Sequence, residues 1–504
     1  MPFDVTRHHR VVIIGAGFSG LGLGIKLREA GEEDFVILEA AAGVGGTWWV
    51  NRYPGCACDV QSHLYSFSFA PRPGWSRQFA PRAEIQRYLA DCVERFGLAR
   101  HLRFNTTVSQ ARWDEERRRW EITDAQGQVR TADVLVSAIG GLSRPARPDI
   151  PGLDEFAGPV IHSQQWPDAL ALAGQRVAVI GTGASAIQFV PHVQREAGRL
   201  DVYQRSAQWI LPKPDREIGP VEQSLYRAFP PARWLVRLAL FLLLETRLPA
   251  FTRFPRLTFL HRRKAMRHLH EQVGDPALRA KLTPDYAMGC KRVLMSNDYY
   301  PAIGAANVEL VTTPIRSIGK DSITDAAGRT RPADVILLGT GFQATAPVPE
   351  GMILGRGGLD LARLWDDGPA AYKGTAVAGF PNFFTLLGPN TALGHNSVIL
   401  MIEGQIRYVV DALAWMQRSG TAVVEVRDAP QQAWNDRLQQ RLERTVWNSG
   451  GCGSWYLHPV SGRNATLWPR FTTTFRWQTR RFDADAYLAE PRTFTSPAGS
   501  SAAR

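Results

Sequence analysis

Two glycine-rich turns constrain the fold of this chain more than any other feature. The first, GAGFSG at residues 15–20, follows the apolar run 11–14, and the second, GTGASA at residues 181–186, follows the apolar run 177–180. A strand that leads through such a turn into a helix is typical of a dinucleotide-binding βαβ unit, because small residues let the backbone approach a pyrophosphate. One such motif is a weak signal, but two predict two dinucleotide-binding domains.

Each turn is followed, 24 positions after its first glycine, by a charged residue, and the two charges are opposite: Glu39 and Arg205. A carboxylate at the end of the second strand accepts hydrogen bonds from ribose hydroxyls and repels a 2′-phosphate. An arginine there binds the phosphate through a bidentate fork. Either residue alone could be a solvated strand end, but the matched offsets argue against this for both. The first site therefore predicts FAD and the second NADPH.

Similar phrases at residues 132–140 (ADVLVSAIG) and 333–341 (ADVILLGTG) indicate an internal duplication. Each is a buried-strand run that ends in small residues, and two related nucleotide domains would each need one. We therefore predict an α/β fold with two Rossmann-like dinucleotide-binding domains, for FAD and NADPH, and an inserted helical lobe.

The 504 residues can form two or three domains of roughly 100 to 200 residues each. We expect a helix at 82–96, strands at 103–108, 111–113, 120–123 and 381–388, a loop at 390–397, and helices from there to 416 and at 429–446. The predicted FAD-binding domain comprises residues 1–143 and 344–492, the NADPH-binding domain 144–212 and 285–343 with its linker motif at 152–167, the helical insertion 213–284, and a disordered tail 493–504.

Composition excludes several other classes of protein. The net charge of +12 fits anionic cofactors as well as polyanions, but there is no nucleic-acid-binding motif, so we expect no nucleic acid partner. The odd number of five cysteines, without metal-ligand spacing, predicts no metal site and favours a reducing compartment. The first apolar run contains the glycine turn and is no signal peptide, and no apolar run reaches about 18 residues, so a cytoplasmic location is predicted.

Within the insertion, the apolar run 234–244 is interrupted by Arg237 and followed by a basic stretch at 253–267. We interpret this run as a buried helix of the inserted lobe. The alternative is an interfacial helix, with weak peripheral contact to an anionic membrane through residues 234–267.

The linker carries the pattern F-x-G-x-x-x-H-x-x-x-W-P at residues 156–167. With it, the chain resembles the type I Baeyer–Villiger monooxygenases among the class B flavoprotein monooxygenases. The related flavin-containing monooxygenases usually lack the Trp-Pro ending. The resemblance extends from residue 11 to about residue 470 and includes the segments GTW at 46–48, NRYPG at 51–55, CD at 58–59, CKR at 290–292, DYY at 298–300 and SWY at 454–456.

This resemblance implies an NADPH- and FAD-dependent monooxygenase that inserts one atom of dioxygen next to a ketone carbonyl, through a C4a-peroxyflavin, to give an ester or lactone. Arg292 would be the catalytic arginine, since a fixed guanidinium stabilises developing negative charge without losing its proton. Asp59 would position Arg292. Lys291 with Arg205 and Ser206 would hold the 2′-phosphate.

The expected cofactor-binding residues come from the two turns and from the motifs above, and Trp455 would contact the nicotinamide cofactor. For FAD they are Gly15, Gly17, Ser19, Gly20, Glu39, Gly46, Thr47, Trp48, Asp59, Tyr65, Val108 and Val398. For NADP they are Gly181, Thr182, Gly183, Ala184, Ser185, Ala186, Gln188, Arg205, Ser206, Lys291, Arg292 and Trp455. His162 lies on the linker, so we expect it to serve as a hinge or in packing.

Three other functions share some of these sequence features. The main alternative is a flavin-containing monooxygenase that oxidises sulfur or nitrogen nucleophiles. A flavin disulfide reductase needs a redox cysteine pair, and Cys56-x-Cys58 has the wrong spacing. A non-catalytic flavin-bound redox sensor would need a lost catalytic position, which the sequence does not show. The particular ketone, the regiochemistry and the oligomeric state do not follow from the sequence.

Overall fold

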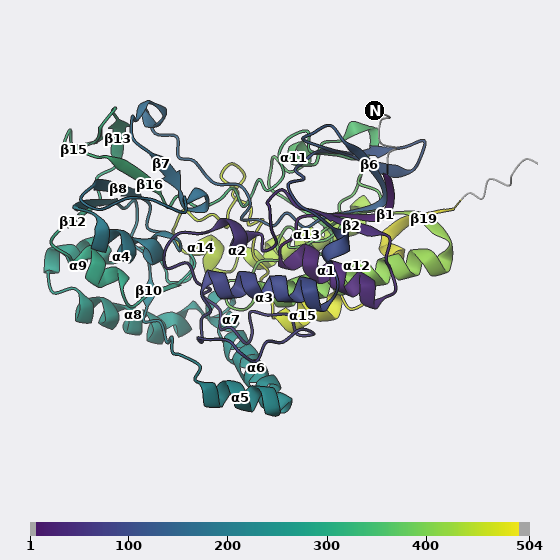
Figure 1. The fold of residues 1–504 in the computed structure, drawn as a ribbon, viewed down its shortest axis with the longest axis horizontal. Helices are drawn as coiled ribbons and strands as arrows, with labels where there is room; N and C mark the ends of the chain where they lie inside the picture. The colour runs from purple at the N-terminus through teal and green to yellow at the C-terminus, as the bar shows by residue number, and fades with distance from the viewer. Residues whose placement is uncertain (1–6, 493–504) are drawn as a thin grey trace, which may run out of the picture.

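The computed structural model describes residues 7–492, so the predicted tail at 493–504 lies outside the described residues. Two lobes, each built around a β-sheet in which one strand leads into a glycine turn, lie side by side, with helices below and between them (Figure 1). The predicted α/β architecture is confirmed.

The first sheet has the strand order β17-β4-β5-β6-β1-β2-β3, with β18 beside β6. Its centre is parallel, and β4, β5 and β6 form an antiparallel excursion. The late strands β17 and β18 pair with β4 and β6, so the chain returns to this sheet near its end. The strands are β1 (Arg7–Ile14), β2 (Phe35–Leu38), β3 (Leu102–Arg103), β4 (Val108–Asp114), β5 (Arg119–Asp124), β6 (Val129–Ser137), β17 (Ile353–Leu354) and β18 (Phe383–Thr385).

The second sheet is parallel throughout, with the order β12-β9-β8-β16-β7. A small antiparallel sheet, β13-β14-β15, is formed by the segment between β12 and β16. The strands are β7 (Val160–His162), β8 (Arg176–Ile180), β9 (Arg199–Tyr203), β12 (Val308–Val311), β13 (Ile315–Ile318), β14 (Ser322–Asp325), β15 (Thr330–Pro332) and β16 (Val335–Leu338).

The two glycine turns have the same local geometry. Gly15 after β1 has φ of +106° and Gly181 after β8 has φ of +107°, a region that favours glycine. A Cβ on Gly15 would lie 2.7 Å from the carbonyl oxygen of Ala138, and one on Gly181 would lie 2.5 Å from that of Gly339. Both glycines thus touch the chain just after the closing strand of their sheet, which is the duplication that the repeated phrases predicted.

Helices cover the sheets and join the lobes. The first turn opens into α1, which packs against the long helix α12, and the second opens into α4. The other helices of the two lobes are shorter. These helices are α1 (Phe18–Glu29), α2 (Thr47–Val50), α3 (Arg82–Arg95), α4 (Ala186–Glu196), α10 (Tyr299–Ile303), α11 (Leu361–Leu364), α12 (Val398–Ser419), α13 (Asp428–Leu442), α14 (Val446–Ser449) and α15 (Thr472–Gln478).

The inserted segment is helical, as predicted, and α5 and α6 project from the lower edge of the molecule (Figure 1). The interpretation of residues 234–244 as a buried helix is wrong for the outward half of α6, where Trp234 is 61% and Leu235 is 56% exposed. Within residues 7–492, no helix has the length and apolar character needed to cross a membrane. The helices are α5 (Pro220–Ala228), α6 (Pro230–Glu245), α7 (Leu248–Thr252), α8 (Phe259–Gln272) and α9 (Pro276–Leu282).

Three further expectations need correction. The segment 103–108 is not one strand, because Asn105 adopts φ of +52° and the chain turns between β3 and β4. The helix expected at 429–446 ends at Leu442. Cys290 and Cys452 form a disulfide, which contradicts the reduced state that the odd number of cysteines favoured. The two are 162 positions apart, so local spacing could not reveal the pair.

Candidate active site

A large cleft lies at the carboxyl ends of strands from both sheets, where ligands bind in open α/β folds. Its volume is about 1070 Å³, just above the usual range for small-molecule sites. Ser137 and Thr385 border it at the first sheet, and Ile180 and Tyr203 at the second. The cleft therefore lies where two dinucleotides bound at the two turns would meet.

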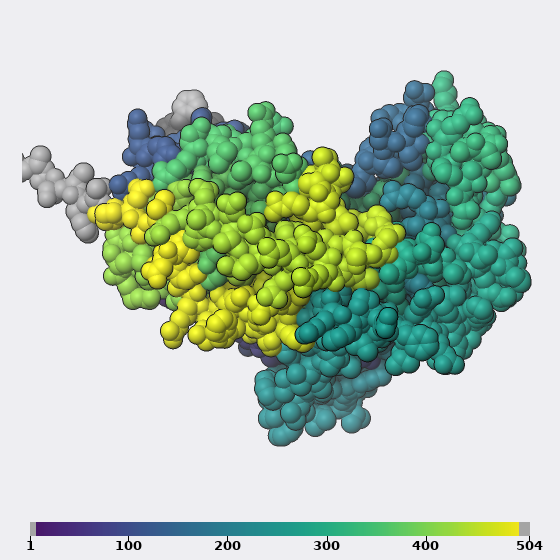
Figure 2. Space-filling view, turned by 180° about the vertical axis from the view of Figure 1, so that it is seen from behind, coloured from purple at the N-terminus to yellow at the C-terminus, as the bar shows by residue number. Residues whose placement is uncertain are grey.

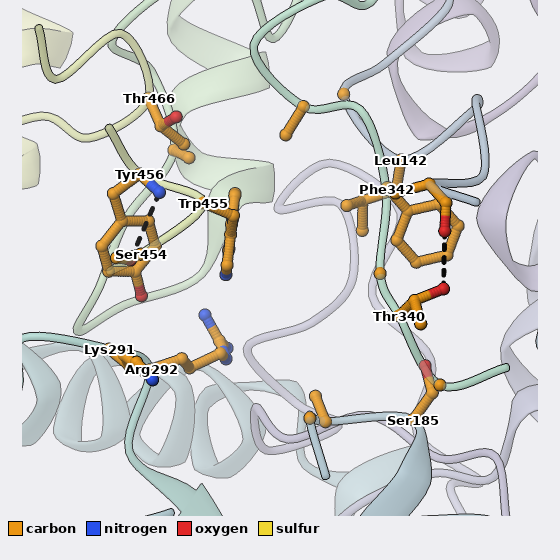
Figure 3. A pocket seen from close by; sticks show the side chains of 18 of the residues that line it. Leu142, Ser185, Lys291, Arg292, Thr340, Phe342, Ser454, Trp455, Tyr456 and Thr466 are labelled. Carbon is orange, nitrogen blue, oxygen red and sulfur yellow. Dashed lines mark hydrogen bonds between the residues drawn. The ribbon is translucent and has the colours of Figure 1, made fainter. Parts of the chain in front are cut away.

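Arg292 and Asp59 form the ionic centre of this cleft. Arg292 donates from Nε and Nη2 to the two oxygens of Asp59, at 2.5 and 2.7 Å, and its guanidinium extends into the open space near Trp455 (Figure 3). Burial alone raises the pKa of Asp59, but the charge of Arg292 and its hydrogen bonds lower it overall. The attraction of Asp59 likewise raises the pKa of Arg292. The arginine is therefore a fixed, permanent cation.

The loops that carry this pair are themselves restrained. Asp59 follows Cys58, whose amide donates to the carbonyl of Ala80 at 3.0 Å. Arg292 lies two residues after Cys290, whose disulfide to Cys452 joins its loop to the segment that carries Trp455. Trp455 is 44% exposed and lines the cleft. The cation and the tryptophan are thus held near each other by a covalent link.

A cluster of cationic and hydroxyl groups lines the cleft beside the second turn. Lys291 donates from Nζ to Oγ of Ser206 at 2.6 Å, and the exposed Arg205 also lines the cleft. Burial, and then repulsion from Arg205, lowers the pKa of Lys291. An anion would relieve this repulsion, so the cluster suits the 2′-phosphate of NADPH.

The residues at the two turns also suit pyrophosphates. Helix α1 begins after Gly17 and α4 after Ser185, and neither first turn receives a hydrogen bond from a capping side chain. Free amides at a helix N-terminus form an anion site. The buried Glu39 accepts hydrogen bonds from the amides of Ala16 at 2.7 Å and Ala41 at 2.8 Å, so its carboxylate lies against the first turn.

The structure brings only some of the residues predicted for FAD into the cleft. Val108 is buried at the start of β4, opposite Asp124, and lies apart from the cleft lining. Gly46 packs against Gly17, so those two glycine segments lie together. Cleft-lining residues are Thr47, Trp48, Asp59, Tyr65 and Val398, whereas Gly15, Gly17, Ser19, Gly20, Glu39, Gly46 and Val108 do not line it.

Nearly all residues predicted for NADP line the cleft. The exception is Ala186, which is buried in the first turn of α4. Gln188 is held by the hydroxyl of Tyr53 at 3.0 Å. The cleft-lining residues are Gly181, Thr182, Gly183, Ala184, Ser185, Gln188, Arg205, Ser206, Lys291, Arg292 and Trp455.

Some cleft residues were missed by the sequence analysis. Tyr456 is buried beside Arg292, and burial raises its pKa to about 12. Its only sequence signal was its place in the SWY segment. Among the described residues, Asn51 Oδ1 and Thr466 Oγ1 are buried without a hydrogen-bond partner, and both residues line the cleft. Such groups fit a polar ligand.

The contacts of His162, and the burial of Cys56 and Cys58, indicate structural rather than catalytic roles. The buried His162 lies 3.0 Å through Nε2 from the carbonyl oxygen of Gly341 and accepts from the amide of Gln164 at 3.1 Å, so it fastens the linker to the end of β16. Cys56 and Cys58 are buried and unbonded, and burial raises the pKa of Cys56 to about 11. A thiol with that pKa is a poor nucleophile, which argues against a disulfide reductase.

Comparison with known proteins supplies the family. A family model described as pyridine nucleotide-disulphide oxidoreductase matches residues 12–227. A curated Baeyer-Villiger monooxygenase of Pseudomonas aeruginosa is 55% identical over 482 residues, covering 96% of this chain and 92% of the relative. The chain belongs to the Baeyer–Villiger monooxygenases.

Solved structures resemble this Baeyer–Villiger monooxygenase over almost its whole length. An oxidized steroid monooxygenase bound to NADP is 31% identical, with a TM-score of 0.83, covering 96% of this chain and 100% of that one. A complex of OTEMO with FAD and NADP is 28% identical, with a TM-score of 0.84 and the same coverage. The fold and the family predicted from the sequence are both confirmed.

Proposed function

We propose that this Baeyer–Villiger monooxygenase uses FAD and NADPH to insert one oxygen atom beside the carbonyl of a ketone, giving an ester or lactone, with Arg292 as the catalytic cation. The observation that carries the assignment of Arg292 is its placement. It is a permanent cation, held by the two hydrogen bonds that it donates to Asp59, in the open part of a cleft bordered by both sheets.

The chain's own residues bind the two cofactors, orient Arg292 and stabilise the negative charge that develops in the reaction. Arg205, Lys291 and Ser206 hold the 2′-phosphate, and the amides that begin α1 and α4 hold the two pyrophosphates. When bound, FAD supplies the redox chemistry that takes hydride from NADPH and activates dioxygen. Asp59 holds the guanidinium of Arg292 in place, where this cation would stabilise the negative charge that develops on the ketone oxygen.

Two further groups shape the reaction space. The indole of Trp48 donates to the hydroxyl of Tyr65 at 3.3 Å, and the rings meet edge to face, forming an aromatic wall that excludes water. Trp455, which lines the cleft and is partly exposed, would contact the nicotinamide. Charged groups act more strongly in a space from which water is excluded.

The test is Arg292→Ala, with Arg418→Ala as a control, because Arg418 is an exposed arginine in the last turn of α12, at the opposite end of that helix from the cleft-lining Val398. We expect Arg292→Ala to retain flavin bleaching by NADPH in anaerobic stopped flow but to lose ester formation by at least about 100-fold. Thioether oxidation should fall less, since sulfur is itself the nucleophile. Ester formation at the rate of the control would remove Arg292 from the mechanism.

The remaining assignments rest on the sequence and the sheets together. Residues 1–143 and 344–492 form the FAD domain and residues 144–212 and 285–343 the NADPH domain, which is supported by the return of β17 and β18 to the first sheet. The partners are a ketone and dioxygen. A cytoplasmic location rests on the sequence alone, and the disulfide argues against it, since such bonds are rare in reducing compartments.

A further inference from the structure

Unlike an ordinary surface helix, α6 is apolar on its outward side as well as on the side that packs against the core. The positions of α6 that are exposed, from 230 to 243, are all apolar. We call five of them the apolar face: Trp234, Leu235, Ala239, Leu242 and Leu243. A helix on a water-exposed surface normally turns its polar side outward. Here the outward half resembles a core surface.

The charge that interrupts the apolar run faces the protein. Arg237 donates from Nη1 to the carbonyl oxygens of His63 at 2.8 Å and Leu64 at 3.3 Å. Burial lowers the pKa of this guanidinium, so its inward placement carries a cost in solvation. The apolar face is therefore left without any charge of its own.

Exposed apolar side chains also gather in the elements that flank α6 in the chain. Of the twenty-one large hydrophobic residues that are exposed in the described part of the chain, eleven lie between residues 221 and 260. Val221 of α5 is 85% exposed and Leu260 of α8 is 71% exposed. Helices α5 and α6 project from the body of the molecule (Figures 1 and 2), so a flat surface can reach them.

The same segment carries most of the net charge of the protein. Residues 221–267 contain ten Lys and Arg but two Asp and Glu, a net +8 of the total +12. Neither acid is unpaired: Glu222 pairs with Arg216 at 2.7 Å, and Glu245 is buried. Arg253, Arg256 and the run 262–264 are exposed. The apolar face is thus flanked by positive charge.

We propose that the apolar face and its basic flank dock this protein onto the surface of an anionic lipid bilayer. An exposed apolar patch marks an interaction site. An amphipathic helix with adjacent Lys and Arg binds at the lipid headgroup boundary, where basic residues are attracted to anionic lipids. The helix lies in the interface and does not cross it. The proposal goes beyond the oxygenation and is independent of it, because vesicle binding is measured without turnover.

The experiment is flotation of the flavin-loaded protein with vesicles of neutral phosphatidylcholine, and of the same lipid with one third phosphatidylglycerol. At low salt we expect flotation with the anionic vesicles alone, and loss of binding as salt rises. Trp234→Ala should weaken partitioning roughly fivefold. Arg253→Ser with Arg256→Ser should weaken it roughly tenfold, because each basic residue near the surface favours binding several-fold.

Matched variants test the location of the surface. Trp477 is also 61% exposed but lies on α15, so Trp477→Ala should leave partitioning unchanged. Arg95→Ser with Arg418→Ser removes the same charge from exposed positions elsewhere. NADPH oxidation shows that each variant is folded. No flotation at low salt, equal losses in the matched variants, or a dimer that Trp234→Ala dissociates would each overturn the proposal, the last by showing that a second copy covers this face.

Discussion

Replacing Glu245 by alanine should destabilise the region where the projecting lobe meets the cleft. Glu245 ends α6 and its side chain is only 8% exposed. Its carboxylate accepts from Asn396 Nδ2 at 2.7 Å, Thr472 Oγ1 at 2.6 Å and the Thr472 amide at 3.0 Å, and lies 3.2 Å from His395 Nε2. Asn396 lines the cleft, so the carboxylate ties α6 to the cleft wall.

The magnitude follows from the donors that Glu245→Ala would leave without an acceptor. Each buried unsatisfied group costs about 1 to 3 kcal/mol. Because water can enter the space that alanine leaves, the sum is smaller than four separate penalties, and we expect about 3 to 5 kcal/mol. In contrast, Glu271 forms an exposed pair with Arg267, worth less than about 1 kcal/mol.

The assay is thermal unfolding together with hydrogen exchange, because a protein of several domains need not unfold in one step. Glu245→Ala should lower the midpoint by several degrees and speed amide exchange near residues 393–398 and at Thr472. Glu271→Ala, in the same lobe, should change neither. Equal effects of the two substitutions would refute the reasoning.

The same substitution has a predicted dependence on pH. Burial alone raises the pKa of Glu245, but its hydrogen bonds to His395, Thr472 and Asn396 lower it overall. A carboxyl group with a lowered pKa in the folded state stabilises fully above its unfolded pKa, about 4.3, and loses that contribution as pH falls through the folded pKa. The difference between the wild type and Glu245→Ala should therefore shrink below about pH 4.

Three other predictions concern the turns, the phosphate site and the disulfide. Arg205→Ala should raise KM for NADPH by about 10-fold or more and leave KM for NADH nearly unchanged, which steady-state kinetics would show; equal changes would exclude a phosphate contact. Gly15→Ala should lose bound flavin, measured by absorbance, because its Cβ would lie 2.7 Å from Ala138 O, whereas Gly74→Ala has open space; flavin retained equally by both would contradict this. Cys452→Ser should lower the unfolding midpoint, and dithiothreitol should lower it in the wild type but not in this variant.

Local spacing predicted much of this molecule because the nucleotide turns are local structures. Gly15 and Gly181 adopt a positive φ, and a few adjacent positions in the sequence are enough to predict this. The opposite charges of Glu39 and Arg205 likewise lie at one fixed offset from their turns. Such features depend on the path of a single βαβ unit, so the sequence is sufficient to find them.

Other features depend on parts of the chain that meet only after folding. The contact of Glu245 with Thr472 joins residues 227 positions apart, and no periodicity in α6 indicates it. Arg237 points inward because the carbonyl groups of residues 63 and 64 accept its hydrogen bonds, and the sequence of α6 does not reveal this contact. From the sequence alone, the apolar run therefore fitted a buried helix equally well. The burial of Tyr456 beside Arg292 is a matter of packing, which spacing alone does not give.

The disulfide between Cys290 and Cys452 also closes the intervening backbone into a covalent ring. This ring includes β16, β18 and α12, and so connects both sheets. A protease that nicks one peptide bond between the two cysteines would leave the fragments joined as a single species under oxidising conditions. On a denaturing gel they would separate only after a thiol is added, and a nicked molecule could keep its shape while its backbone is cut.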